Sequence, residues 1–179
     1  MFVAGGLGAA PIYPQVKFMS DNGIKTDVVL GSRTSGLIIF REELTAVSNR
    51  LLIATNDGSE GIKGFVTDAM KDIFEREGIN YSLIITIGPM IMMKAVTEFT
   101  RSLGLKTIAS LNTLMVDGTG MCGACRVTVG GKTRFTCVDG PEFDAHLVDF
   151  DEAMRRQGMY RNEERLKSDD DHNCSIGLN

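Results

Sequence analysis

Short runs of β-branched and other apolar residues alternate with helix-like segments through the first two-thirds of the chain. The runs have the length and composition of strands, and they cover residues 2–4, 25–30, 50–55, 81–87 and 106–113. In the intervening segments, most clearly the last two, apolar residues recur every three or four positions, as on the buried face of a helix; these segments cover residues 11–20, 40–47, 64–77 and 89–103. The alternation predicts an α/β fold: a doubly wound, parallel, five-stranded sheet with helices on both faces.

The pattern changes over residues 115–144, which are rich in glycine and cysteine and too irregular for another strand–helix unit. Within this stretch, residues 126–129 and 133–136 predict a hairpin whose turn is Gly130-Gly131. We expect a charged helix over residues 149–157 and a polar tail after it. The chain is therefore expected to comprise two folded units and a C-terminal helix with a tail, over residues 1–113, 114–148 and 149–179.

Composition narrows the class of protein. Of 179 residues, 43% are hydrophobic and 23% are charged, as in an ordinary globular domain. The net charge of −4 and the pI of about 5.2 give no indication of a nucleic-acid partner. No apolar run approaches the ~20 residues of a membrane-spanning helix and no signal peptide is visible, so we expect a cytoplasmic protein. A glycine turn begins at residue 5, which leaves a clipped first strand, and we therefore expect more protein upstream.

Glycine marks the turn after each of the first four predicted strands. Because the carboxyl ends of parallel strands meet at one edge of the sheet, these turns are expected to line one ligand site. The first turn, Gly6-x-Gly8-x-x-Pro11, suits a dinucleotide, since glycines let the backbone approach a pyrophosphate at a helix N-terminus. It departs from the usual motif in having Pro11 in place of the third glycine.

The second predicted strand does not end in the acidic residue that holds the ribose 2′-hydroxyl of NAD. Ser32 and Arg33 follow it instead. Arg33 can hold a 2′-phosphate or lie against the adenine or the pyrophosphate, so the choice between NAD and NADP stays open. The plainer alternatives are a tight turn without a ligand, a surface role for Arg33, a turn-stabilising role for Asp57, and core packing with a flexible pocket wall for residues 90–93.

Three of the four cysteines lie close together in the chain and share a spacing with an aspartate. Asp117, Cys122, Cys125 and Cys137 follow the plant-type ferredoxin pattern, with aspartate in the first position. The loop from Asp117 to Cys125 is rich in glycine, so its backbone N–H groups can surround negatively charged sulfurs. Cys137 would arrive from the far strand of the hairpin and complete the ligand set of a 2Fe–2S cluster.

Other interpretations of these residues remain. The three cysteines and His146 can form a structural zinc site. Asp117 can be a bystander, with water or another group as the fourth ligand, and the cysteines can also carry no metal. Cys174, a lone thiol in the polar tail, is expected to have no role.

The glycine turns and the cysteine pattern together resemble a known family. Residues 5–11, 31–34 and 88–89 resemble the nucleotide domain of the ferredoxin–NADP reductase superfamily. The cysteine segment resembles the C-terminal cluster domain of the electron-transfer subunit of dihydroorotate dehydrogenase B. With aspartate in the first position, residues 115–123 resemble in particular the small subunits of NADH-dependent ferredoxin:NADP oxidoreductases, also called sulfide dehydrogenase beta subunits.

The resemblance implies roles for particular residues. The pyrophosphate would lie at the first turn, the adenosine half at the second and the nicotinamide at the fourth, and the cluster would bind to Asp117 and the three clustered cysteines. The implied cofactor-binding residues are Gly5, Gly6, Gly8, Ala9, Ala10, Pro11, Gly31, Ser32, Arg33, Thr34, Asn56, Asp57, Gly88, Pro89 and Met90.

The resemblance also implies an oxidoreductase with further parts. In that family an FAD-binding β-barrel precedes the nucleotide domain and passes electrons between NAD(P)H and the cluster. A large iron–sulfur flavoprotein subunit is the usual partner. These 179 residues lack the barrel, so we expect the chain to need an FAD domain from elsewhere. The alternatives are a non-catalytic nucleotide-binding module with a zinc site, and an inactive fragment.

Overall fold

The computed structural model describes residues 1–78 and 81–160. Its main sheet has the order β4-β3-β2-β1-β5-β6-β9. The five predicted strands form its centre and are all parallel; they are β1 (Phe2–Gly5), β2 (Asp27–Ser32), β3 (Arg50–Thr55), β5 (Ile84–Ile87) and β6 (Thr107–Ser110). Two short strands that the sequence did not predict extend the edges, β4 (Ile62–Lys63) in parallel with β3 and β9 (Glu142–Asp144) antiparallel to β6.

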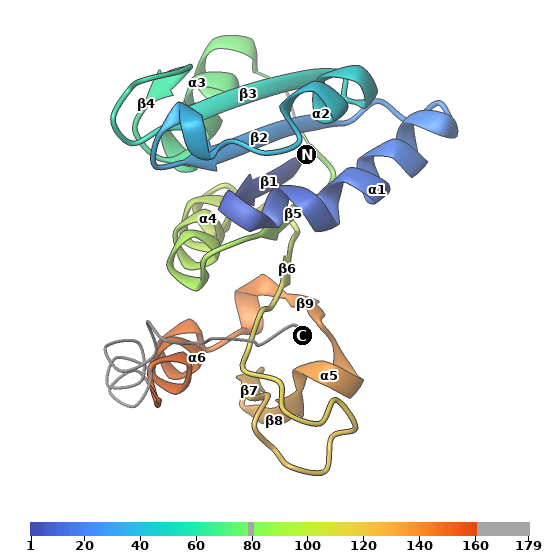
Figure 1. The fold of residues 1–179 in the computed structure, drawn as a ribbon, viewed down its shortest axis with the longest axis vertical. Coiled ribbons are helices and arrows are strands. Elements are labelled where there is room, and N and C mark those ends of the chain that lie inside the picture. Colours follow the sequence, from blue (N-terminus) through green and yellow to red (C-terminus); the bar gives the residue numbers. More distant parts are fainter. Residues whose placement is uncertain (79–80, 161–179) are drawn as a thin grey trace, which may run out of the picture.

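Helices cover both faces of the sheet, as predicted (Figure 1). Phe2 and Ala4 of β1 face α1 and α2, whereas Val3 between them faces α3 and α4. This alternation along one strand follows from the two-residue repeat of side-chain direction, and it explains why consecutive positions of β1 are apolar. The four helices are α1 (Ala9–Asp21), α2 (Arg41–Val47), α3 (Val66–Glu77) and α4 (Met90–Ser102).

The C-terminal part forms a smaller unit beyond β6, at the bottom of Figure 1. Its hairpin joins β7 (Arg126–Val129) to β8 (Lys132–Phe135) through Gly130 and Gly131. These two glycines have φ of 58° and 73°, the positive values that a type I′ hairpin turn requires at both central positions. The hairpin is followed by α5 (Thr136–Asp139), β9, a 3-10 turn (Ala145–Leu147) and α6 (Phe150–Gln157).

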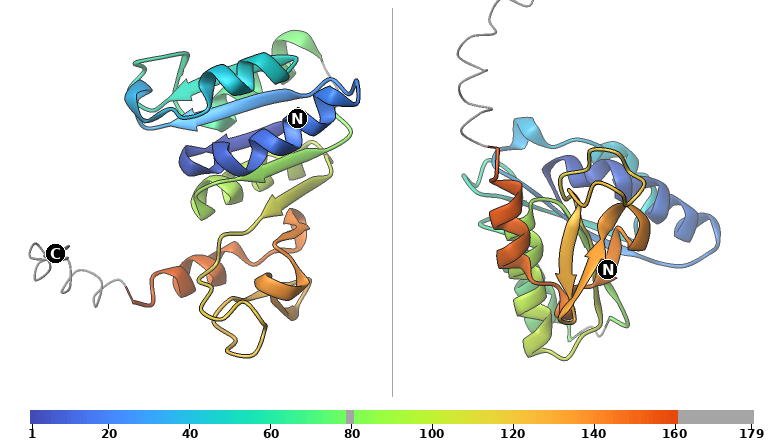
Figure 2. Two further views of the ribbon diagram at one scale, coloured as in Figure 1. Left: turned by 45° about the vertical axis from the view of Figure 1, so that its right-hand side comes forward. Right: turned by 90° about the horizontal axis from the view of Figure 1, so that it is seen from below.

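A third apolar cluster attaches this unit to the sheet. Met93 of α4 and Ala109 of β6 pack with Val127 of the hairpin and with Phe150 and Ala153 of α6. Figure 2 shows α6 beside α4, and the two helices are also joined by an ion pair of 2.7 Å between Lys94 and Asp151. No described helix is long and apolar enough to cross a membrane.

A buried carboxylate anchors the end of the sheet where β2 begins. Asp27 accepts hydrogen bonds from Arg50 (2.6 Å), Asn49 (2.7 Å) and the Tyr81 hydroxyl (2.6 Å). Burial works to raise the pKa of Asp27, but these three donors outweigh it and lower the pKa to about 2. A lowered pKa means that the ionised form stabilises the fold above the ordinary carboxyl pKa, and that this contribution is lost as the pH falls toward 2.

We therefore expect Asp27→Asn to lower the free energy of unfolding at pH 7 by about 2 kcal/mol, and by less at pH 3. Urea unfolding at the two pH values measures both quantities. Asp21→Asn is the control, because the only described partner of Asp21 is the exposed Lys17 four residues away, and such pairs contribute little. An equal loss at both pH values would rule out the charged cluster as the cause.

Candidate nucleotide and iron–sulfur sites

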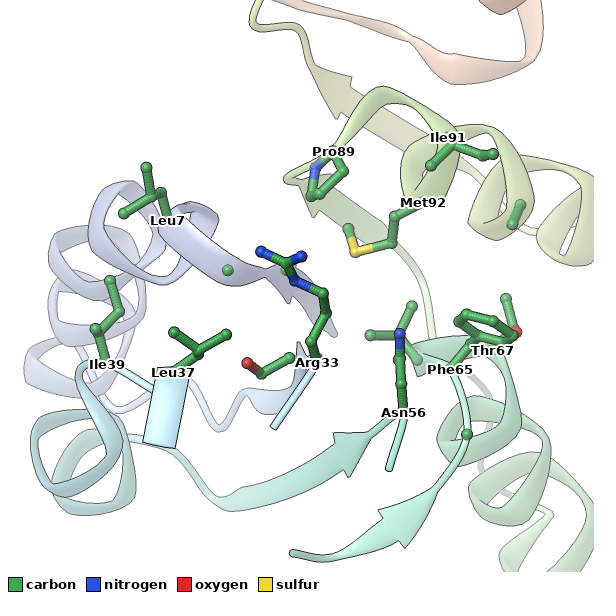
Figure 3. Close-up of a pocket in the computed structure, with 17 residues that line it drawn as sticks. Leu7, Arg33, Leu37, Ile39, Asn56, Phe65, Thr67, Pro89, Ile91 and Met92 are labelled. Carbon is green, nitrogen blue, oxygen red and sulfur yellow. The ribbon is translucent and has the colours of Figure 1, made fainter. Parts of the chain in front are cut away.

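A pocket of about 620 Å³ opens at the carboxyl edge of the sheet, between the ends of β1, β2 and β3 and the first turns of α3 and α4. This is the edge where a doubly wound sheet binds ligands. Its walls are largely apolar, with Leu37 and Ile39 on one side and Met92 and Phe65 on the other (Figure 3). Seven of the predicted nucleotide-binding residues line it: Gly5, Gly6, Gly31, Ser32, Arg33, Asn56 and Pro89.

Arg33 supplies the only charge among the described residues that line this pocket. Figure 3 shows its side chain extending from the end of β2 into the space below Pro89 and Met92. No other described residue forms a hydrogen bond or ion pair with its guanidinium. A free guanidinium in a mostly apolar pocket is suited to an anionic group such as a phosphate.

Three glycines allow the elements around the pocket to approach closely. A methyl group on Gly8 would overlap the backbone carbonyl of Ile87, one on Gly5 would overlap the Met92 sulfur, and one on Gly31 would overlap Val66. Gly8 is the most demanding of the three, because its neighbour is the backbone at the end of β5 and cannot move away as a side chain can. The predicted glycine loop therefore has a packing role in addition to any contact with a ligand.

Gly8→Ala is expected to lower the free energy of unfolding by about 1–3 kcal/mol, because overpacking forces the first turn away from β5. The same displacement should weaken nucleotide binding, measured by calorimetry alongside chemical denaturation. Gly36→Ala is the matched control, because a methyl group there meets no atom within 4 Å. A Gly8→Ala protein as stable as the control would contradict the close approach to Ile87.

Several predicted residues do not line the pocket. Met90 is 4% exposed and belongs to the core, as the alternative interpretation had it. Asp57 accepts hydrogen bonds from the backbone and the hydroxyl of Ser59, which lower its pKa, so it stabilises a turn. The others that do not line the pocket are Gly8, Ala9, Ala10, Pro11, Thr34 and Gly88.

The sequence analysis also missed residues that do line the pocket. The largest omission is the segment Gly64-Phe65-Val66-Thr67 at the start of α3, where the Phe65 side chain is 65% exposed. Leu37 and Ile39 were missed as well, whereas Met92 belongs to residues 90–93, for which a pocket wall was among the interpretations. Only the glycine at position 64 gave a local signal of a turn near the sheet edge.

Two of the predicted cluster ligands are in contact. The sulfurs of Cys125 and Cys137 are 3.2 Å apart. Since metal–sulfur bonds are about 2.3 Å long, one metal ion can bind two sulfurs at this separation. Cys125 lies directly before β7 and Cys137 lies in α5, directly after β8, so the hairpin brings them together as expected. The contact with Cys125 raises the pKa of the Cys137 thiol.

The loop that carries the other two predicted ligands is organised by Asp117. Its two carboxylate oxygens accept hydrogen bonds of 2.9 Å from the backbone N–H groups of Thr119 and Cys122. These bonds lower the pKa of Asp117 and keep it ionised. The Gly120 N–H lies against the Cys137 thiol and lowers its pKa, in opposition to Cys125. The loop thus faces the cysteine pair and offers a backbone donor to sulfur.

The full set of four ligands is not assembled. Among residues 1–78 and 81–160, no three histidine, cysteine, aspartate or glutamate side chains lie close enough to share a metal ion. Cys122 is exposed in the loop. His146 lies away from the cysteines, with its Nε2 atom 2.8 Å from the Leu105 carbonyl oxygen, so the structure does not support the zinc alternative that included it. Cys174 lies outside the described residues.

The donor set fits an iron–sulfur cluster better than it fits a single metal ion. The C-terminal unit supplies three thiols, an ionised carboxylate and a glycine-rich loop whose Gly120 N–H lies against a thiol. Cys125 and Cys137 would hold one iron, and Cys122 and Asp117 are the remaining donors that the loop can bring to a second.

Two protein families match the chain in these same regions. Residues 2–98 match the oxidoreductase NAD-binding domain. Residues 112–149 match the iron–sulfur cluster binding domain of dihydroorotate dehydrogenase B. The first match contains the pocket from Gly5 to Ala95, and the second contains Asp117 and the three cysteines.

Individual relatives agree with the family matches. The chain is 46% identical over 93% of its length to a Thermotoga maritima homologue of the electron transfer subunit of dihydroorotate dehydrogenase B (NAD⁺), of which it covers 58%. It is 57% identical over 92% of its length to an uncharacterized Clostridium beijerinckii protein, of which it covers 55%. It also matches a chain from a structure of the NADH-dependent reduced ferredoxin–NADP oxidoreductase, which is described in connection with flavin-based electron bifurcation. The TM-score is 0.84 and the sequence identity is 46%. The match covers 94% of this chain and 60% of that one.

The chain therefore spans little more than half the length of these relatives. The first family match covers more than half of its 179 residues, from Phe2 to Glu98. The chain belongs to the family of oxidoreductase NAD-binding domains and carries, after that domain, an iron–sulfur cluster binding domain of the dihydroorotate dehydrogenase B type.

Proposed function

We propose that this chain relays electrons between NADH or NADPH and a 2Fe–2S cluster, as the electron-transfer part of a flavin-dependent oxidoreductase. The observation that carries the proposal is the presence, in one chain, of a sheet-edge pocket with a free arginine and of a cysteine pair backed by an N–H-rich loop. The names of its relatives point the same way, since they include electron transfer subunits.

In this proposal residues 1–113 bind the nucleotide. The pyrophosphate lies across Gly5 and Gly6 at the start of the first helical turn, where backbone N–H groups are unpaired by the helix. The Arg33 guanidinium holds a phosphate group or the adenosine half. Met92 and Phe65 form an apolar wall of the pocket, and the nicotinamide would lie beside Pro89.

Residues 114–148 bind the cluster through Asp117, Cys122, Cys125 and Cys137. The hairpin holds Cys125 and Cys137 in contact, and the loop would bring Cys122 and Asp117 to the cluster. All three thiols must remain reduced to bind iron, which is consistent with the cytoplasmic location that we propose.

A flavin is required by the electron count. A nicotinamide exchanges two electrons as hydride, whereas a 2Fe–2S cluster exchanges one, so a flavin must divide the pair. We propose that FAD is bound by a barrel domain outside these residues, and that a large iron–sulfur flavoprotein subunit is the further partner. The direction of electron flow depends on that partner.

The test uses the anaerobic, cluster-loaded chain and follows the visible absorption of the cluster. NADH or NADPH added without a flavin should leave the absorption unchanged. An FAD-loaded barrel domain taken from a full-length relative and added in catalytic amount should then bleach it, with one nicotinamide nucleotide oxidised for every two clusters reduced. Bleaching without the flavin, or none with it, would contradict the proposed relay.

A further inference from the structure

The last turn of α6 reaches back to the loop that carries the predicted cluster ligands. Arg156 donates hydrogen bonds from Nη2 to the carbonyl oxygens of Ala124 (3.1 Å) and Gly123 (3.5 Å). These two residues are the whole link between Cys122 and Cys125. Helix α6 lies beyond the matched domain, which ends at residue 149, so no family match assigns it a role.

The helix that carries Arg156 is itself held firmly. Phe150 and Ala153 are buried in the cluster shared with α4 and β6, and the Asp149 side chain caps the first turn by accepting from the Glu152 N–H at 2.8 Å. In the last turn, the Gln157 side chain donates to the Asn112 carbonyl at 2.7 Å. The end of α6 thus holds the loop both where it leaves the sheet, at Asn112, and between two of its cysteines.

Within residues 1–78 and 81–160, the charge of Arg156 is uncompensated. No carboxylate in the described part of the chain pairs with it, and its Nε atom is buried with no hydrogen-bond partner there. Carbonyl oxygens accept its hydrogen bonds but do not neutralise it. Asp117 is the opposing charge in the loop, and both of its oxygens are occupied by backbone N–H groups of the loop itself.

We propose that Arg156 is a positioning residue for the cluster and that its charge raises the cluster's reduction potential. This inference rests on the proposed 2Fe–2S site. Fixing the carbonyls of Gly123 and Ala124 orients the peptide groups that connect Cys122 to Cys125, so the two thiolates are presented together. A positive charge beside these peptides favours the reduced cluster, because reduction adds one negative charge.

The experiment compares three variants of the full chain after anaerobic cluster assembly. Arg156→Gln removes the charge, Arg156→Lys keeps the charge without the planar fork, and Arg155→Gln is the control on the exposed face of the same helix. Two readouts are taken: the midpoint potential of the cluster and the rate at which an iron chelator removes its iron.

We expect Arg156→Gln to shift the midpoint potential to a more negative value and to release iron about ten times faster or more, as is usual when a residue supporting a metal ligand is lost. Arg156→Lys should release iron faster while it keeps a potential near that of the wild type. Arg155→Gln should change neither. The midpoint potential and the rate of iron release are measured separately. If Arg156 had a purely structural role, its substitution would change the rate of iron release and leave the potential unchanged.

A potential that is the same in Arg156→Gln and Arg155→Gln would overturn the electrostatic role, and equal iron release would overturn the positioning role. If Arg156→Gln takes up no cluster, the rate of iron release from Arg156→Lys tests the proposal instead. Faster release than from Arg155→Gln supports the proposal, and equal release overturns it. A wild-type chain that assembles no 2Fe–2S cluster would instead refute the proposed function, so the two failures are distinguishable.

Discussion

Cys137→Ser is expected to abolish the cluster, with the iron content of the reconstituted chain falling to less than about a tenth of the wild-type value. Cys137 is half of the 3.2 Å sulfur pair that the hairpin holds in place. Without it, Cys122 and Cys125 are left on a single short loop, with nothing from the far side of the hairpin to close the site. Iron and sulfide assays on protein reconstituted under the same conditions measure the effect.

Cys174→Ser is the matched control, because its thiol is not among the predicted ligands. It should bind iron as the wild type does. Full iron content in Cys137→Ser would show that the cysteine pair is not part of the metal site. Loss of iron in Cys174→Ser would show that the ligand set is wrong.

Arg33→Gln should weaken the binding of NADH or NADPH by about 10- to 100-fold. A charged hydrogen bond is worth about 1.5–3 kcal/mol, and each 1.4 kcal/mol is a factor of ten in affinity. The effect should be that large because Arg33 is the only charged residue among the described lining of the pocket. Calorimetric titration of the cluster-free chain measures the affinity independently of any electron transfer.

Two further observations make this second prediction specific. Binding to the wild type should weaken as salt is added, since it depends on a charge, and binding to Arg33→Gln should depend less on salt. Arg134→Gln, an exposed substitution on the hairpin, should leave the affinity unchanged. Equal affinities for wild type and Arg33→Gln would place the anionic part of the nucleotide elsewhere.

The central sheet was predictable from the sequence because its signals are local. Each of the five parallel strands contains adjacent apolar residues, and the hairpin turn is specified by two neighbouring residues, Gly130 and Gly131. The two added strands have no such signal: β4 has two residues, and β9 contains Glu142 and Asp144 around a single Phe143. They pair only because the sheet edge is already present.

The site was predictable from the sequence only where the type of residue indicates its role. Glycine turns and spaced cysteines do so, and they identified the sheet edge and the cysteine pair. The pocket walls did not, because Leu37 and Phe65 are ordinary apolar residues that meet there through the tertiary fold. For the same reason the sequence predicted α6 as a charged helix but not the contact between Arg156 and Ala124.

The most direct test of the account is the metal content of the 179-residue chain after anaerobic assembly with iron and sulfide in the presence of zinc. We predict two irons and two acid-labile sulfides per chain, with no bound zinc. A colourless protein that holds zinc and no sulfide would contradict it, and would leave a nucleotide-binding module without an electron carrier.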